Sequence, residues 1–239
     1  MMHVLALETS HPVGSVVLRR ADGAIARATL SERGGQARAL TPAIGRLLGE
    51  LGLTPRDLGL VVVGLGPGGY TGLRLGLATA KTLAVVLRIP ILGVTSTAVL
   101  AASPGVPAGP VLASVEATQD FVYGQSFDKR PDGTLVAGGD PFIEPAEVAA
   151  GRVAPGTAVV GSGARLLAAR GVVVAPGSEE LMPRADELLT LGLSRHARGE
   201  VDDERALLPL YLRPSEAERL WERRQAAAAA NDIGRVDGA

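Results

Sequence analysis

The sequence predicts an α/β protein built from two related lobes, each with a mixed β-sheet and flanking helices. Apolar runs of strand length alternate with stretches whose apolar residues recur at helical spacing. One pattern of strand, second strand and Asp-Gly turn occurs twice, over 4–23 and again over 111–133. Each copy begins with Val-Leu-Ala, and a glutamate follows further along the same strand, Glu8 in the first copy and Glu116 in the second. The pattern favours an internal duplication, and a chance match of short apolar strings is the alternative.

The first lobe is predicted to combine five strands with three helices. The Asp22-Gly23 turn is typical of a hairpin. Pro42 falls in or near the first turn of a helix over 36–52, where proline is tolerated. Ser96 or Thr97 is expected to cap a short helix. The expected elements are strands over 4–10, 14–20, 22–30, 58–65 and 89–96, and helices over 36–52, 72–88 and 97–102.

The second half carries weaker patterns. Residues 103–110, SPGVPAGP, have the composition of a linker. Two strands follow within 111–133, then a strand, glycine turn and helix over 158–172 and a helix over 185–199 that ends in glycine. We therefore expect an N-terminal lobe over 1–105, a smaller lobe over 106–215, and a partly disordered tail over 216–239. The last helix of the second lobe is a candidate to pack back on the first.

Composition excludes several classes of function. The 239 residues carry a net charge of −1, which gives no overall attraction to nucleic acid. There is no cysteine, so disulfides, thiolate metal sites and a cysteine nucleophile are excluded. His3, His11 and His196 lack the spacing of a zinc site. No signal-peptide pattern and no apolar run long enough to span a membrane occurs. We expect a soluble, cytoplasmic protein without a membrane partner.

The stretch GLGPGGYTGLRLG, residues 64–76, is a glycine-rich turn between a strand and a helix. Its first six residues match the dinucleotide fingerprint G-x-G-x-x-G, but the following strand ends without the acidic residue that binds ribose. The Lys of a phosphate-binding P-loop is also missing. Arg74 and the backbone N–H groups of Gly68, Gly69 and Tyr70 could bind an anion. A tight turn with Arg74 in a structural ion pair explains the residues equally well.

Glu8, Thr9 and Ser10 end the first strand, where a hairpin could hold a phosphate or Mg²⁺. Glu116 occupies the matching place in the second copy. A solvated strand end is the simpler explanation. No G-x-S-x-G nucleophile motif occurs, and no histidine is placed as an evident base. The sequence therefore assigns no catalytic residue, metal ligand or cofactor to this chain.

A stripe of small residues follows the glycine turn: Gly72, Gly76, Ala80 and Ala84 recur every four positions. Such a stripe lets another backbone approach closely. From the residues alone, packing on the chain's own sheet and a contact with a second subunit are equally plausible, with Leu73 supplying apolar surface in either case.

Taken together, LALETS, VVVGLGPGGYTGLRLGLATAKTLA and PLYLRPSEAE resemble the TsaB (YeaZ) family, bacterial subunits for threonylcarbamoyladenosine synthesis in tRNA. The resemblance covers about residues 3–217. It implies the actin/Hsp70/sugar-kinase type of fold. It also implies a non-catalytic partner of a paralogous, metal-bearing transferase subunit (TsaD), joined by an ATPase subunit (TsaE). Gln36 and Leu40 stand where a metal-binding relative would have histidines. Glu8 replaces a common aspartate, and EATQDFVYG lacks an arginine common in relatives.

In this family, helices of the N-terminal lobes form both the contact with the transferase and the homodimer of the free subunit. The resemblance therefore implies a seam that Ala80→Arg or Gly76→Leu would break without unfolding the chain. The tRNA is contacted only through the complex, and ATP or ADP at the subunit junction is left open. The implied interface residues are Leu40, Ile44, Leu47, Leu48, Gly72, Leu73, Gly76, Leu77, Ala80 and Ala84.

Two other functions compete with the scaffold. The first is a nucleotide-dependent phosphotransferase of the same fold, with Glu8 and Glu116 flanking Mg-ATP. The residues for its nucleotide contacts would be Glu8, Thr9, Ser10, Gly68, Gly69, Tyr70 and Arg74. The second, a metallopeptidase, lacks the ligands it needs. We therefore predict a scaffold and activator subunit.

Overall fold

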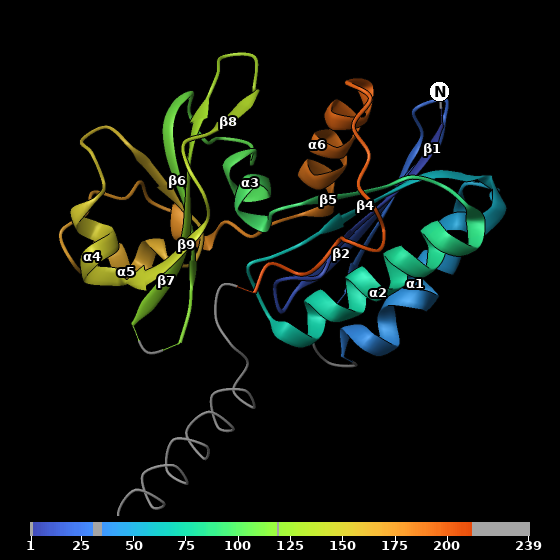
Figure 1. Ribbon diagram of the computed structural model, residues 1–239, viewed down its shortest axis with the longest axis horizontal. Helices are drawn as coiled ribbons and strands as arrows, with labels where there is room; N and C mark the ends of the chain where they lie inside the picture. Colours follow the sequence, from blue (N-terminus) through green and yellow to red (C-terminus); the bar gives the residue numbers. More distant parts are fainter. Residues whose placement is uncertain (1, 31–34, 119, 212–239) are drawn as a thin grey trace, which may run out of the picture.

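Two mixed β-sheets, one in each lobe, form the framework of the computed structural model (Figure 1). The structure describes residues 2–30, 35–118 and 120–211, so the predicted tail lies outside the described residues. The first sheet has the strand order β3-β2-β1-β4-β5. The second has the order β10-β6-β7-β8, and β9 also pairs with β7. The predicted α/β fold with two lobes and mixed sheets is confirmed.

Both faces of the first sheet are covered by helices, because apolar side chains that follow one another along a strand point to opposite faces of the sheet. Leu5 and Leu7 face α1 and α2, whereas Val4 and Ala6 face α6, which arrives from the end of the chain (Figure 1). The elements of this layer are β1 (His3–Glu8), β2 (Gly14–Arg19), β3 (Ile25–Leu30), α1 (Gln36–Glu50), β4 (Leu58–Gly64), α2 (Tyr70–Leu87), β5 (Ile91–Val94), α3 (Ser96–Ala101) and α6 (Ala185–Ala197).

The second sheet carries shorter helices. Its elements are β6 (Gly109–Glu116), β7 (Phe121–Lys129), β8 (Leu135–Ala137), β9 (Phe142–Pro145), α4 (Ala146–Gly151), β10 (Ala158–Val160) and α5 (Ala164–Ala168). The sequence did not predict β8, β9 and α4, because these elements are only three to six residues long and show no clear periodicity.

Strand pairing repeats between the lobes. In the first, β1 pairs antiparallel with β2 and parallel with β4, and β2 pairs antiparallel with β3. In the second, β6 pairs antiparallel with β7 and parallel with β10, and β7 pairs antiparallel with β8. Both lobes are therefore built on one topology, as the repeated sequence pattern predicted.

Of two local predictions, the position of Pro42 near the first turn of its helix is confirmed, and the cap of the short helix is wrong. Pro42 lies in the second turn of α1, where its ring nitrogen cannot donate a helical hydrogen bond. Its side chain is exposed, so it faces away from the sheet. The cap of α3 is Thr95, whose side chain accepts a hydrogen bond from the Ala98 N–H, because the helix starts one residue earlier than predicted.

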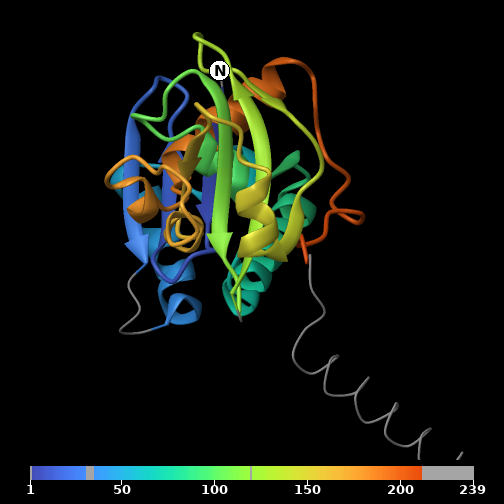
Figure 2. The same cartoon turned by 90° about the vertical axis from the view of Figure 1, so that its left-hand side faces the viewer.

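After α6 the chain returns along the first lobe as a strap, residues 200–211, seen at the side of the molecule in Figure 2. Asp202 bridges to Ile91 on the edge of β5, and the Leu210 N–H donates to the Leu65 carbonyl at 2.8 Å. The strap thus covers the edge of the sheet next to α2. In the part of the chain that the structure describes, no helix is both long and apolar enough to cross a membrane.

Candidate functional site: the glycine turn and the strand end beneath it

The glycine turn packs against the end of β1, residues 8–10. Ideal Cβ atoms on Gly64, Gly68, Gly72 and Gly76 would each collide with that segment: on Gly64 with the Glu8 carboxylate, on Gly68 with the Ser10 carbonyl, and on Gly72 and Gly76 with Thr9. The Thr9 hydroxyl also donates to the Gly72 carbonyl at 2.8 Å. Four glycines at this spacing therefore make room for the chain's own strand end.

Glu8 is fully buried beneath this turn. Its Oε1 accepts from the Ser10 N–H at 2.8 Å, and its Oε2 accepts from the Ser96 hydroxyl at 3.1 Å. Burial raises the pKa of the Glu8 carboxyl above its ordinary value, and the hydrogen bonds from Ser10 and Ser96 partly offset this. The carboxyl group joins three segments of the first lobe.

Two of the predicted anion contacts, the Gly69 N–H and Arg74, are engaged within the chain. The Gly69 N–H donates to the Ser10 carbonyl at 2.7 Å. Arg74 donates from Nε to the Tyr211 hydroxyl at 2.8 Å, and its guanidinium lies 4.0 Å from the centre of the Tyr70 ring. Tyr70 and Tyr211 stack with ring centres 5.3 Å apart. Arg74 thus helps to hold the end of the strap on α2.

The implied interface residues lie inside the chain's own core, which corrects their placement. Gly72 is half-buried. All other residues of the set are buried, and the side chains of those that are not glycine are at most 7% exposed. Ala80 has no exposed surface, so Ala80→Arg would disrupt the core instead of leaving the chain folded. The residues concerned are Leu40, Ile44, Leu47, Leu48, Leu73, Gly76, Leu77, Ala80 and Ala84.

The opposite side of the same two helices is exposed, and we call it the outer face. Val85 and Val86 are 57% and 72% exposed, and Cβ atoms on Gly45 and Gly49 would have open space around them. The sequence contained a signal for this face, because apolar residues at helical spacing mark the buried side. The outer face includes Ala37, Thr41, Gly45 and Gly49 on α1, and Thr71, Ala78, Thr82, Val85 and Val86 on α2, together with the exposed charged residues Arg38, Arg46 and Glu50 of α1.

The second lobe repeats the contact with different chemistry. Cβ atoms on Gly161 and Gly163 would collide with Ser114 of β6, much as Gly64 meets Glu8. Ser114 is fully buried, and its hydroxyl has no hydrogen-bond partner. Glu116, the predicted counterpart of Glu8, is exposed, and its N–H donates to the Ser162 hydroxyl at 3.0 Å. In space the counterpart of Glu8 is Ser114, so the predicted pairing of two carboxylates was wrong.

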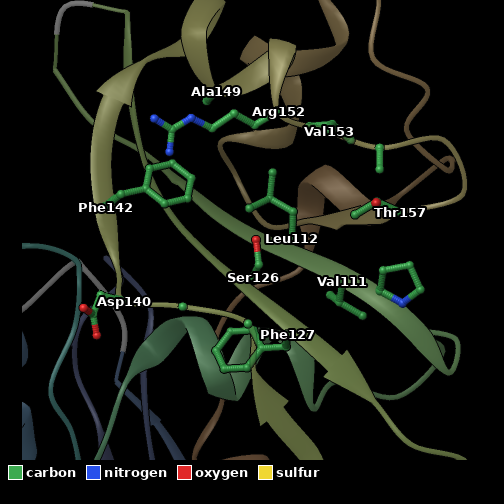
Figure 3. Close-up of a pocket in the computed structure, with 14 residues that line it drawn as sticks. Val111, Leu112, Ser126, Phe127, Asp140, Phe142, Ala149, Arg152, Val153 and Thr157 are labelled. Carbon is green, nitrogen blue, oxygen red and sulfur yellow. The ribbon is translucent and has the colours of Figure 1, made fainter.

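A pocket of about 450 Å³ lies on the second sheet beside α4 (Figure 3). Figure 3 shows Leu112 and Ser126 side by side on its floor, with Phe142 and Arg152 at one wall. Arg152 pairs with Glu144 at 2.7 Å. Among the described residues no group of three or more His, Cys, Asp or Glu side chains could hold a metal ion.

Comparison with known proteins decides the family. A family model described as "TsaD: tRNA N6-adenosine threonylcarbamoyltransferase" matches residues 35–165. A solved structure, an uncharacterised protein from Pseudomonas aeruginosa with similarity to peptidase YeaZ, is 30% identical with a TM-score of 0.77. The match covers 89% of this chain and 100% of that chain. The chain belongs to the TsaB (YeaZ) family.

Two relatives of this family carry its name. The tRNA threonylcarbamoyladenosine biosynthesis protein TsaB of Escherichia coli is 28% identical over 222 residues, 89% of this chain and 95% of that protein. TsaB of Bacillus subtilis is 43% identical over 103 residues, 43% of this chain and 44% of that protein. The predicted family is therefore confirmed. The region matched by the TsaD model includes the glycine turn and both helices of the outer face, so this part of the chain is similar to the transferase family.

Proposed function

We propose that this chain is a non-catalytic scaffold and activator subunit for the synthesis of threonylcarbamoyladenosine in tRNA, in the cytoplasm. It binds the paralogous, metal-bearing transferase TsaD, acts with the ATPase subunit TsaE, and contacts tRNA only through that complex. The names of its TsaB relatives and the match of the TsaD family model support this role.

The burial of Glu8 carries the non-catalytic part of the proposal. A carboxylate that binds Mg-ATP must present free oxygen atoms to the cleft. Both oxygens of Glu8 accept hydrogen bonds inside the chain, and Gly64 closes over the carboxyl group. Ser10 packs against Gly68, and the Gly69 N–H, which a phosphate would need, donates to the Ser10 carbonyl at 2.7 Å. These contacts disfavour the phosphotransferase alternative.

We assign the contact with TsaD to the outer face of α1 and α2. Figure 1 shows these two helices side by side over one face of the first sheet. Gly45 and Gly49 leave open space on the surface of α1, and exposed Val85 and Val86 supply apolar area on α2. The same face would form the homodimer when the partner is absent, since a two-fold contact uses one patch twice.

Substitutions on the outer face test this assignment. Gly45→Arg adds a long side chain where nothing lies nearby, and it replaces a helix-interior glycine by a better helix former, worth about 0.5–1 kcal/mol. We expect Gly45→Arg and Val86→Arg to fold normally, to lose co-purification with TsaD and to lose support of tRNA modification. Val173→Arg, at an 89% exposed valine of the second lobe, is the matched control.

Retained binding in both variants would overturn the placement of the interface. Activity has a separate test: modification of tRNA is measured with the complete set of subunits, with Glu8→Gln in place of the native chain. We expect full support by Glu8→Gln and no hydrolysis of Mg-ATP by the chain alone. Hydrolysis that disappears in Glu8→Gln would reinstate the phosphotransferase.

A further inference from the structure

A groove of about 610 Å³ lies between the two lobes, and no part of the proposed function uses it. Its walls come from α6 and α3 on one side and from β7 and β8 on the other, elements that meet at the junction of the lobes in Figure 1. Leu191, Phe127 and Leu135 supply apolar surface. A volume of this size at a domain junction is typical of a small-molecule site.

Two opposite charges face this groove from different lobes. Lys129 projects from β7 and Glu187 from α6. The Lys129 ammonium donates to the Ser103 carbonyl at 3.2 Å, and Glu187 Oε2 is shielded from solvent without a hydrogen-bond partner. No ion pair within 4.0 Å involves either side chain in the described part of the chain.

Among the other charged residues of the groove, Asp132 accepts from the Thr134 N–H at 2.9 Å and Arg198 pairs with Glu200 at 2.7 Å. Asp186 pairs with Arg27 at 2.7 Å, and Arg195 pairs with Glu200 at 2.7 Å and with Asp202 at 3.1 Å. Lys129 and Glu187 are thus left with unused hydrogen-bonding capacity. Burial lowers the pKa of the Lys129 ammonium and raises that of the Glu187 carboxyl, as expected of charged groups that lack a full partner.

We infer that this groove binds a free α-amino acid with an apolar side chain. The ligand carboxylate would pair with Lys129, its ammonium group would pair with Glu187, and its side chain would lie on Leu191 and Phe127. A zwitterion satisfies both unmatched charges at once, whereas a single anion or cation satisfies one and leaves the other unpaired. The inference is independent of the contact with TsaD.

Isothermal titration calorimetry of the full chain with L-leucine tests this site. L-Leucinamide keeps the ammonium and lacks the carboxylate, 4-methylpentanoate keeps the carboxylate and lacks the ammonium, and glycine lacks the side chain. We expect leucine to bind at least about tenfold more tightly than each of the three, because each lacks one contact.

Charge variants show whether the binding occurs in this groove. Lys129→Met should remove the preference for leucine over leucinamide, and Glu187→Gln should remove the preference for leucine over 4-methylpentanoate. Glu204→Gln, at a carboxylate of the strap outside the groove, should bind as the native chain does. Circular dichroism verifies the fold of each variant. Absence of leucine binding at millimolar concentration, or binding unchanged in both groove variants, would overturn the inference.

Discussion

The two lobes share one strand topology but differ in what lies beneath the glycine turn. In the first lobe, Glu8 is buried and both of its oxygens accept hydrogen bonds. In the second, Ser114 takes the equivalent place and its hydroxyl has no partner. The glycines are required in both lobes for the same steric reason, so a shared glycine pattern does not imply shared chemistry.

The helices differ as well. In the first lobe α1 and α2 have 15 and 18 residues, and they cover the sheet and present a continuous outer face. In the second, α4 and α5 have six and five residues, too short to cover the sheet, and the pocket of Figure 3 lies beside α4. A helix of n residues is about 1.5n Å long, so length alone decides how much of a sheet is covered.

The largest effect is expected for Gly64→Ala. The added Cβ meets the buried Glu8 carboxyl group, which cannot move aside, so we expect the free energy of unfolding to fall by about 3 kcal/mol. Urea denaturation measures the change. Adding Glu8→Ser, which copies the second lobe, should restore part of the loss. A Gly64→Ala protein as stable as the native one would refute the steric role.

Gly163→Ala is the matched change in the second lobe. Its Cβ would meet the Ser114 hydroxyl, a smaller group than the Glu8 carboxyl. We expect a loss of about 1–2 kcal/mol, measured in the same urea titration. Ser114→Ala in the same chain should relieve most of it. A loss larger than that of Gly64→Ala would show that the second lobe is the more tightly packed of the two.

The pH dependence of stability should differ between native protein and Glu8→Gln. Because burial raises the folded-state pKa of Glu8 above the ordinary 4.5, this group favours the fold most at low pH. Its contribution is complete below the unfolded-state pKa and is lost as pH rises through the folded-state pKa. The stability of native protein relative to Glu8→Gln should therefore decrease with rising pH, by at most about 1.4 kcal/mol per pH unit.

Urea titrations of the two proteins from pH 4 upward, at roughly one-unit steps, follow this difference. Carboxylates whose pKa is lowered, such as Asp57 and Glu200, act in the opposite direction, but they are present in both proteins and cancel. A difference that is constant with pH would mean that the folded-state pKa of Glu8 is not raised above its unfolded-state value.

Ser114→Ala alone should have the smallest effect. The hydroxyl makes no hydrogen bond, so removing it leaves no group unpaired, and we expect a change within about 0.5 kcal/mol or a small gain. Thermal unfolding of the two proteins side by side measures it. A loss of more than about 1 kcal/mol would indicate a hydrogen bond to Ser114 in solution and would narrow the contrast between the lobes.

The elements of the first lobe could be predicted from sequence because their apolar periodicity is strong. The helix over 36–52 and the strand over 58–65 appear as α1 and β4 within two residues. In the second lobe, β8 and β9 are too short for periodicity to be visible. At the candidate site, the residues around Glu8 and Gly68 do lie together as the sequence predicted, but their contacts in the structure are with one another: Ser10 packs against Gly68, and the Gly69 N–H donates to the Ser10 carbonyl.

The sequence by itself determined the α/β class, the two related lobes and the family, because periodicity, repetition and specific motifs are local properties of the chain. Only the tertiary structure decided the role of the glycines, since a missing Cβ makes equal room for a phosphate and for the chain's own backbone. It also decided that Ser114, and not Glu116, matches Glu8. That pairing depends on which residues the glycine turns contact, and such contacts between distant segments leave no trace in local sequence.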